Sequence, residues 1–421
     1  MSRISSRAAA DPSDAVVDAV VVGAGVVGAA CAHRLARAGL CVAVVDRGPV
    51  AGGTTGAGEG NLLVSDKAPG PELDLALLSA RLWRELAAEA GDLGAGPVEY
   101  EAKGGLVVAP DPVALKALRA FAEGQRAAGV AAAEVAAGEL GALEPHLAPG
   151  LAGGVHYPQD AQVQPARAAA HLLAASGAAL VLGEEVVAVL RDPSGAVRGV
   201  RTARRTLSAP VVVNAAGTWG GQIAALAGVT LPVLPRRGFV LVTEPLPRVV
   251  RHKVYAADYV ADVASDSAAL QSSAVVEGTP AGPVLVGATR ERAGFDRSLS
   301  TEALRRLAAQ ATALFPVLAG VRALRVYHGF RPYLPDHLPA IGPDPRAPGL
   351  LHACGHEGAG IGLAPATGAL IAAAVTGAPP PLDPRPFRPE RAFPDEDPSG
   401  GGPGPGPVNL HSVRSREDDT P

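Results

Sequence analysis

The stretch that decides the fold is Val20-Val21-Val22-Gly23-Ala24-Gly25-Val26-Val27-Gly28. It continues a strand that is predicted over residues 18–22 and is apolar from Ala19 onward. A helix is predicted to follow from residue 26 to residue 38, with Gly39 as its stop. Glycines at this spacing between a strand and a helix are typical of a turn that holds a dinucleotide. The sequence therefore predicts a nucleotide-binding βαβ unit at the start of the fold.

Each glycine of the stretch has its own physical task. Gly23 permits the tight turn, Gly25 lets the backbone approach a pyrophosphate, and Gly28 lets helix and strand pack closely. The first helical turn, at Val26 and Val27, offers free N–H groups and a positive dipole end to phosphates. We therefore predict that these five residues belong to a cofactor site.

The next strand and the loop after it decide which dinucleotide fits. The strand is predicted over residues 40–46, and its last residue, Asp46, can bind ribose hydroxyls. A carboxylate there would repel a 2′-phosphate, so NADP is disfavoured. The loop over residues 52–61 is rich in small residues, which suits a flavin running past the pyrophosphate. A nicotinamide cofactor and a merely flexible loop are the alternatives.

Composition limits the classes of protein that this chain can belong to. The 421 residues suggest two domains, and 48% hydrophobic residues are enough for a large core. A net charge of -4 and only 4% aromatic residues argue against nucleic acid as a partner. No apolar run is long enough to predict a membrane span.

The three cysteines, Cys31, Cys41 and Cys354, have no metal-binding spacing. They are too few to hold an iron–sulfur cluster, which takes four thiolates. So few cysteines also argue against a disulfide scaffold, and we expect a cytoplasmic protein.

Four separated motifs, in order, resemble the FAD-binding D-amino acid oxidase superfamily. The first runs from Gly23 through Asp46 to Gly53-Thr54-Thr55, and the second is Asn214-Ala215-Ala216-Gly217-Thr218-Trp219 at the end of a strand. The third is Gly329-Phe330-Arg331-Pro332 with the segment 338–342, and the fourth spans 355–368. Within this superfamily the chain is most similar to glycine oxidases, D-hydroxyproline dehydrogenases, opine oxidase B subunits and the flavin subunit of hydrogen cyanide synthase.

The resemblance implies an α/β fold in which a Rossmann-like FAD-binding domain is interrupted by an α+β substrate domain with a mostly antiparallel sheet. The FAD-binding domain is expected over residues 17–96, 158–228 and 328–383. The substrate domain is expected over 97–157 and 229–327. A flexible leader over 1–16 and a disordered, Pro/Gly-rich tail over 384–421 complete the predicted organisation.

The resemblance also carries cofactor contacts onto further positions. Val186 lies where the backbone of the family contacts adenine, although packing in the core explains a valine in a strand at least as well. A helix is expected from Pro365, with its positive end toward the flavin. Besides the five residues of the first stretch, the expected cofactor-binding residues are Asp46, Arg47, Thr54, Thr55, Gly58, Asn61, Val186, Ala215, Gly217, Trp219, Gly355, His356, Gly358, Gly360 and Ile361.

Two residues are expected to bind the substrate. In the family, the arginine at the place of Arg331 holds the substrate carboxylate, and a guanidinium can do so with two parallel hydrogen bonds. Tyr259 resembles the tyrosine that helps to bind the same group. Glycine oxidases carry a second arginine where this chain has Gly358, which indicates a bulkier or differently held substrate than glycine. His356 is not expected to act as a base.

These residues predict an FAD enzyme that oxidises the Cα–N bond of an amino-acid-like carboxylate, of D-hydroxyproline or opine type. No cysteine lies near Gly329, where some sarcosine oxidases attach flavin, so FAD is expected to be non-covalent. The lysine that sarcosine oxidases use to activate O2 has no obvious counterpart, which favours a dehydrogenase with an iron–sulfur or other electron-accepting subunit. An O2-using amine oxidase and a non-catalytic flavin subunit are the alternatives.

Overall fold

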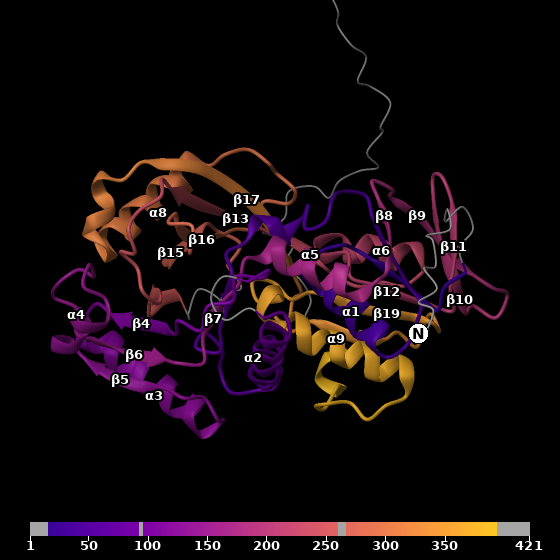
Figure 1. Cartoon of the computed structure of the whole chain (residues 1–421), viewed down its shortest axis with the longest axis horizontal. Helices are drawn as coiled ribbons and strands as arrows, with labels where there is room; N and C mark the ends of the chain where they lie inside the picture. The colour runs from indigo at the N-terminus through magenta and orange to yellow at the C-terminus, as the bar shows by residue number, and fades with distance from the viewer. Residues whose placement is uncertain (1–15, 92–95, 260–266, 394–421) are drawn as a thin grey trace, which may run out of the picture.

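The structure is a computed structural model, and it describes residues 16–91, 96–259 and 267–393. Figure 1 shows two lobes, one built on a largely parallel sheet and the other on a long, mostly antiparallel sheet. The predicted fold class, a Rossmann-like α/β part interrupted by an α+β part, is confirmed. The division of the chain into domains stays a prediction.

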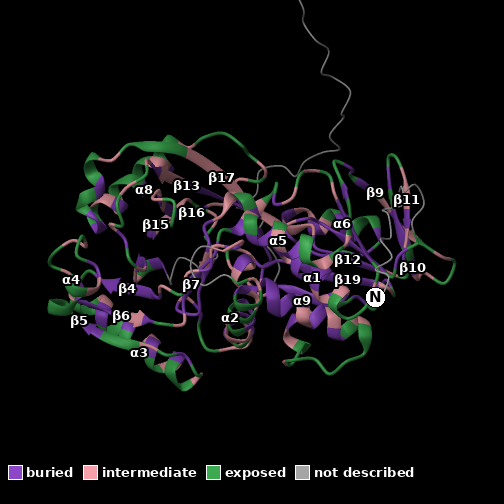
Figure 2. Ribbon diagram, in the orientation of Figure 1, coloured by how far each residue is buried: buried purple, intermediate pink, exposed green. Residues whose placement is uncertain are grey.

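The first sheet has the strand order β18-β19-β12-β1-β2-β8. Five strands are parallel, and β18 pairs antiparallel to β19. The strands are β1 (Ala19–Val22), β2 (Val42–Asp46), β8 (Ala179–Leu182), β12 (Val211–Asn214), β18 (Ala340–Pro343) and β19 (Leu350–Cys354). Apart from the edge strand β8, which is mostly exposed, these short strands are almost wholly buried because layers pack on both faces of the sheet (Figure 2).

The side chains of this sheet alternate between two cores. Val21 and Val44 join one cluster with the helices α1 (Val26–Arg37), α5 (Pro165–Ser176) and α9 (Gly360–Thr376). Val20 and Val45 join the other, with α6 (Gly220–Leu226) and a three-stranded antiparallel sheet. That small sheet is formed by β9 (Val186–Arg191), β10 (Val197–Thr202) and β11 (Thr206–Ser208), and the pair β3 (Asn61–Leu62) and β7 (Ala161–Gln162) lies apart from it.

The second sheet has eight strands in the order β17-β13-β16-β15-β14-β4-β6-β5. Within this second sheet, β14 and β4 are the only described strands that pair in parallel. Its outer face packs on α8 (Thr301–Leu314), and its inner face looks toward the first lobe. The strands are β4 (Gly105–Ala109), β5 (Ala133–Ala136), β6 (Gly153–Tyr157), β13 (Leu234–Thr243), β14 (Lys253–Ala256), β15 (Gln271–Gly278), β16 (Val284–Arg290) and β17 (Ala323–Tyr333).

The remaining helices lie around these sheets. The α-helices are α2 (Pro71–Glu89), α3 (Pro112–Ala127) and α4 (Leu140–Leu143). The 3-10 turns are η1 (Thr54–Ala57), η2 (Ala137–Glu139), η3 (Gly217–Trp219), η4 (Pro316–Gly320) and η5 (Arg385–Phe387). No helix in the described ranges is both long and apolar enough to cross a membrane.

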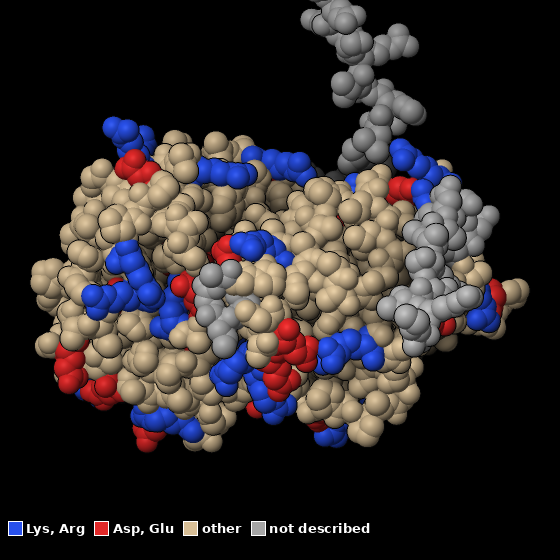
Figure 3. Space-filling view, in the orientation of Figure 1, with Lys and Arg blue, Asp and Glu red and all other residues tan. Residues whose placement is uncertain are grey.

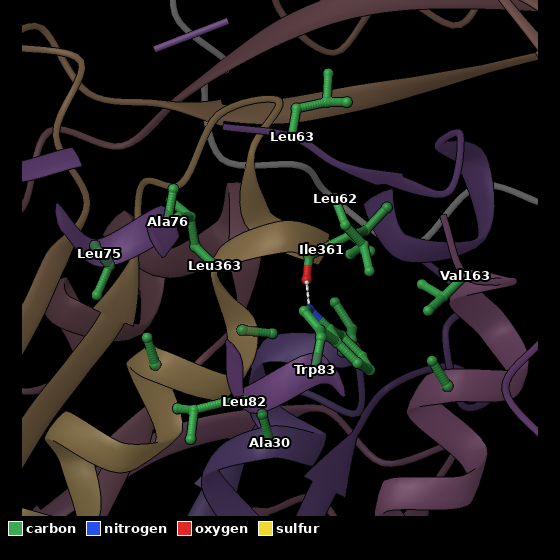
Figure 4. Close-up of a cluster of buried hydrophobic side chains, with 14 of the residues drawn as sticks. Ala30, Leu62, Leu63, Leu75, Ala76, Leu82, Trp83, Val163, Ile361 and Leu363 are labelled. Atoms are coloured by element: carbon green, nitrogen blue, oxygen red, sulfur yellow. Dashed lines mark hydrogen bonds between the residues drawn. The ribbon is translucent and has the colours of Figure 1, made fainter. Parts of the chain in front are cut away.

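The start of α9 differs from the prediction that a helix begins at Pro365. The helix begins at Gly360, and Pro365 lies inside it. A proline has no N–H, so the Ile361 carbonyl one turn earlier loses its helical donor. The indole Nε1 of Trp83 on α2 donates to that carbonyl at 3.0 Å (Figure 4), and the displaced Ala366 N–H donates to the Ser79 hydroxyl at 3.2 Å. Side chains of α2 therefore replace the missing backbone bonds, and the helix continues through the proline.

The predicted terminal segments differ in how much of them the structure describes. The prediction of disorder from residue 384 is wrong for residues 384–393. Phe387 is fully buried in the core of the first lobe, and Arg391 donates to both carboxylate oxygens of Asp336. These two side chains find an apolar and an ionic partner that the local composition did not reveal. Residues 394–421 and the leader up to residue 15 lie outside the described residues, and Val16 makes a single β-bridge with Ser208.

Candidate active site

A cavity of about 320 Å³ lies between the two lobes and takes its walls from both sheets. The strands β1, β2, β12 and β19 contribute residues at or just beyond their carboxyl ends, where open α/β sheets bind ligands. The strands β13, β16 and β17 of the second sheet contribute the opposite wall. All the predicted site residues line this cavity except Gly28 and Gly355.

The amino end of α1 opens onto the cavity. Gly25 is its N-cap and brings no side chain to cap it, and the first turn carries no acidic residue. Thr55 takes the Val26 N–H, and the N–H groups that follow are left for a ligand in the cavity. Gly23 and Gly28 pack against each other, since a Cβ on Gly28 would lie 1.9 Å from the Gly23 carbonyl oxygen. Gly28 therefore serves the packing of helix on strand, as its position in the fingerprint predicts.

Asp46 ends β2 beside this turn and holds it in shape. Its Oδ2 accepts a hydrogen bond from the Ala24 N–H at 2.7 Å, and its Oδ1 accepts one from the Gly48 N–H at 2.7 Å. Each carboxylate oxygen keeps a further lone pair toward the cavity that Asp46 lines. The carboxylate can therefore organise the glycine turn and accept from ribose hydroxyls at the same time.

The small-residue loop after β2 is an ordered part of the cavity wall. Thr55 Oγ1 accepts from the Val26 N–H at 3.0 Å, and Thr54 Oγ1 donates to the Phe330 carbonyl at 2.6 Å. These two bonds join the loop to α1 on one side and to β17 on the other. Asn61, at the end of the loop, keeps its Oδ1 buried without a hydrogen-bond partner among the described residues, and it lines the cavity. Such a group invites a ligand donor.

The far end of the cavity is lined by Val186 and by the turn after β12. Ala215, Gly217 and Trp219 line it there, and the Arg47 guanidinium lies 4.2 Å from the centre of the Trp219 ring. Trp219 stacks in turn on Phe295 with centroids 5.5 Å apart. Arginine and tryptophan thus form a flat, cationic wall.

A buried hydrogen-bond chain supports this turn from behind. The Asn214 side chain donates to the Gly220 carbonyl at 2.8 Å and meets the His352 Nδ1 at 3.1 Å. The other ring nitrogen of His352 lies 3.1 Å from Asp344. Hydrogen bonds from Arg346 and His352 outweigh burial and hold the pKa of Asp344 well below its usual range. The carboxylate therefore stays ionised and fixes the imidazole that orients Asn214.

The amino end of α9 forms the opposite side of the cavity. Gly358, Gly360 and Ile361 line it, and the first turn of the helix carries no acidic residue. Gly355 lies behind this wall with φ +83°, and a Cβ there would lie 2.1 Å from a methyl carbon of Leu334. The turn therefore needs glycine for backbone conformation and packing, and Gly355 does not touch the cavity.

His356 lines the cavity but does not have the character of a base. Burial lowers the pKa of His356 to about 3, so the ring is neutral at physiological pH. Its Nε2 lies 2.9 Å from Thr367 Oγ1, whose own hydrogen is donated to the Leu363 carbonyl at 3.0 Å. The Nε2 must then donate to the threonine, which leaves Nδ1 as the acceptor. This agrees with the expectation that His356 is not a catalytic base.

The residues along this cavity fit a flavin dinucleotide. The uncapped end of α1 and the missing side chains at Gly23 and Gly25 leave room for a pyrophosphate. Asp46 lies where ribose hydroxyls can donate, and Val186 with the Arg47–Trp219 wall offers apolar and flat surfaces for a base. The α9 end places N–H groups at the other extreme, where a reduced isoalloxazine ring carries negative charge. Bound there, FAD supplies the hydride-accepting chemistry that no side chain has.

Arg331 stands on the substrate-domain wall, on β17. Its Nη1 donates to the Thr289 carbonyl at 2.7 Å, and it has no ion-pair partner among the described residues. Burial, reinforced by the neighbouring charge of Arg290, lowers the pKa of Arg331 to about 10, so it stays a cation. Tyr259 lines the same part of the cavity and is buried. The structure therefore brings both predicted substrate residues together.

Gly358, the position at which glycine oxidases carry a second arginine, borders the Arg331 guanidinium. A Cβ on Gly358 would lie 3.5 Å from Arg331 Nε, within ordinary contact distance. A long side chain at this position would reach over the guanidinium. Glycine leaves that space open to a ligand.

Sequence reasoning missed a buried ionic cluster behind the cavity wall. Glu59 lines the cavity and lies 3.5 Å from Lys253 Nζ, which also forms a short ion pair with Glu277. All three are almost fully buried, and desolvation raises the pKa of Glu59. A Cβ on Gly287 would come within 2.6 Å of the Glu59 carboxylate, so β16 needs glycine there. Lys253 therefore lies near the cavity, but the carboxylates of Glu59 and Glu277 compensate its charge.

Sequence reasoning also missed Arg290, at the end of β16. Its guanidinium lies 5.0 Å from the centre of the Tyr259 ring, and the residue is 4% exposed.

No group of histidine, cysteine or acidic side chains that could hold a metal ion occurs in the described part of the chain.

Comparison with known proteins places this cavity in a family context. A family model described as FAD dependent oxidoreductase, DAO, matches residues 18–374. A glycine oxidase of Geobacillus kaustophilus is 31% identical over 84% of this chain and 92% of its own, and its crystal structure superposes with a TM-score of 0.80 over 90% of this chain and 99% of its own.

Two further proteins show the range of these similarities. The hydrogen cyanide synthase subunit HcnC of Pseudomonas aeruginosa is 32% identical over 90% of this chain and 97% of its own. An iminodiacetate oxidase from Chelativorans sp. BNC1 superposes with a TM-score of 0.76 at 26% identity, over 88% of this chain and 98% of its own.

Proposed function

Because this chain belongs to the DAO family of FAD-dependent oxidoreductases, we propose that it dehydrogenates the Cα–N bond of an amino acid or of an N-substituted or cyclic amino acid. The product is an imine, which water then hydrolyses. Its relatives include a glycine oxidase and an iminodiacetate oxidase, and both glycine and iminodiacetate are amines that carry a carboxylate beside the reacting carbon.

The observation that carries this proposal is the Arg331 guanidinium on the cavity wall, which has no ion-pair partner among the residues that the structure describes. A buried cation without an anion is costly, and a carboxylate satisfies it with two charge-assisted bonds. Held in this way, a substrate extends into the cavity toward the end of α9. Arg331 thus fixes the orientation, and a fixed orientation is what a hydride transfer requires most.

The roles of the chain's own residues follow from this placement. Tyr259 closes the substrate end of the cavity and keeps it dry with its buried ring. His356, neutral and bonded to Thr367, shapes the wall without exchanging a proton. The two helix ends stabilise negative charge at the pyrophosphate and at the far ring of the cofactor. We propose that the predicted cofactor-binding residues that line the cavity hold the cofactor in this way.

The electron acceptor is proposed to be a partner subunit or a quinone-like carrier. HcnC is by its name one subunit of a synthase, which supports an assembly in this part of the family. The charge of Lys253, whose partner Glu59 lines the cavity, is compensated by Glu59 and Glu277, which makes this lysine a poor stabiliser of negative charge on reduced oxygen. The cysteines are free and two are buried, which suits a reducing cytoplasm.

An anaerobic reduction screen tests the proposed function. The purified holoprotein is mixed with D- and L-amino acids, cyclic imino acids and N-alkyl amino acids, and bleaching of the oxidised flavin band is followed. We expect bleaching by at least one carboxylate-bearing amine and none by its decarboxylated analogue. Bleaching by the analogue at an equal rate, or by no amine at all, would contradict the proposal.

A further inference from the structure

Three arginines and a glutamine lie in one row on the cavity side of the second sheet. Side chains two residues apart on a strand share a face. Arg331 lines the cavity on β17, whereas the other members lie next to lining residues: Arg236 two residues before Gly238 on β13, and Arg290 two residues after Ala288 on β16. We call Arg331, Arg236, Arg290 and Gln271 the arginine row.

The strand register places the members of this row beside one another. Arg236 is directly paired with Arg331, and Arg290 is directly paired with Gln271. The strands β13 and β16 are joined next to the row by the bridge between Arg237 and Glu291. This bridge sets Arg290 opposite Gly238, so Arg290 lies diagonal to Arg236, and the hydrogen bond from Arg236 to Gln271 at 3.0 Å connects the two halves of the row.

Within the part of the chain that the structure describes, only one of the three guanidiniums forms an ion pair with a carboxylate. Arg236 forms an ion pair with Glu357 and donates to Gln271 at 3.0 Å. Arg331 donates to a backbone carbonyl, and Arg290 keeps its Nη1 buried with no hydrogen-bond partner among the described residues. Arg290 rests instead on the π-face of Tyr259, a cavity-lining ring.

Two buried cations, Arg290 and Arg331, have no carboxylate partner within the described ranges, which points to a ligand that supplies two anionic groups. Leaving a guanidinium N–H buried and unbonded is unfavourable, and the mutual repulsion of Arg290 and Arg331 adds to it. A substrate with a single carboxylate, bound at Arg331, would leave the buried Arg290 Nη1 without a hydrogen bond. The open space over Gly358 gives the substrate room for a second polar arm.

We infer that Arg290 binds a second carboxylate of the substrate, so that the preferred substrates are dicarboxylic amines. This inference rests on the proposed function, which it narrows. The second carboxylate can come from an N-carboxyalkyl group, as in iminodiacetate, or from a side chain, as in aspartate. The shared chemistry is two carboxylates flanking one oxidisable C–N bond.

Two isosteric pairs of probes test the inference and separate these sources. The first pair is iminodiacetate and its monoamide, and the second is aspartate and asparagine, each as D- and L-isomer. The members of a pair differ by one negative charge and almost nothing in shape. We expect the dicarboxylate of at least one pair to reduce the flavin about 10- to 150-fold more efficiently than its amide.

The variant Arg290→Gln should bring the ratio of the rates with dicarboxylate and amide close to one, since hydrogen-bonding capacity is kept while the charge is lost. Arg290→Lys should retain part of it. The exposed Arg325 on the same sheet offers a matched control, and Arg325→Gln should behave as the wild type. FAD content and melting temperature show whether each variant is folded.

A binding measurement keeps the inference separate from the proposed function. Glutarate is iminodiacetate with a methylene in place of the amine, so it cannot react. It should shift the flavin absorption spectrum with a Kd at least about tenfold lower than that of its monoamide, and Arg290→Gln should remove the difference. If no amine reduces the flavin but glutarate discriminates in this way, the proposed function fails and the second anion site stands. Equal treatment of every acid and its amide by the wild type, or an unchanged preference in Arg290→Gln, would overturn the inference.

Discussion

Replacing Arg331 by leucine removes the carboxylate anchor and should lower kcat/KM steeply. The substitution deletes the donor to the Thr289 carbonyl and leaves the substrate carboxylate facing a buried apolar wall. Truncating one partner of a buried charge pair costs roughly 2–5 kcal/mol. At about 1.4 kcal/mol per decade, the expected loss in kcat/KM is about 30- to several-thousand-fold. Arg331→Lys should recover only part, because an ammonium lacks the planar fork.

The assay is anaerobic stopped-flow reduction of the bound flavin by the best substrate of the screen. The FAD-to-protein ratio serves as the control and should stay normal, because Arg331 is assigned to substrate and not to cofactor. A variant that retains near wild-type kcat/KM would refute the reasoning, since the carboxylate would then be held elsewhere. Loss of FAD in the same variant would instead point to a role in cofactor binding.

Four further outcomes are expected. Heat or acid precipitation should release FAD into the supernatant, and Gly25→Val should prevent FAD binding by filling the space at the α1 end; yellow colour that stays in the pellet would disprove non-covalent binding. The reduced enzyme should pass electrons to a dye faster than to O2, and stopped-flow reoxidation in air that outpaces dye-coupled turnover would make it an oxidase. Burial raises the pKa of Asp160 to about 7, so the protonated carboxyl contributes stability below about pH 4 that is lost as the pH rises through 7. The variant Asp160→Asn does not titrate, so its free energy of unfolding should rise by up to about 4 kcal/mol relative to that of the wild type between pH 4 and pH 8. Urea unfolding measures this, and a difference that stays constant with pH would count against it. Trp83→Phe should cost about 1–3 kcal/mol of unfolding free energy, because it strands the Ile361 carbonyl, and Trp219→Phe, which breaks no such bond, should cost less in the same urea titration.

Local patterns were sufficient to predict residues that line the cavity on its first-lobe side, and the cofactor roles of these residues stay predictions. The glycine fingerprint, the terminal Asp46 and the motif around Asn214 are contiguous in sequence, and their physical tasks are set by backbone geometry that neighbours in the chain determine. The helices over 112–127 and 301–314 were equally readable, because apolar spacing and N-cap residues mark them.

The missed features depend on contacts between distant segments. Arg290 acquires its significance only from the register of β16 against β15 and β13, which no local pattern specifies. Glu59 lies in a loop of small residues, and its partner Lys253 is 194 residues away. Pro365 is normally a helix-start residue, and only the indole of Trp83 from another helix lets α9 begin earlier. Phe387 likewise finds its core far from its own polar segment.

The placement of the two tryptophans makes the protein its own optical probe. Trp219 lines the cavity, and Trp83 bonds to Ile361, which also lines it. The chain has no third tryptophan. Nearly all of the intrinsic ultraviolet emission therefore originates next to the cofactor, where transfer of excitation to an isoalloxazine ring would quench it. Emission intensity should consequently report cofactor loading directly in unlabelled protein, without any engineered reporter.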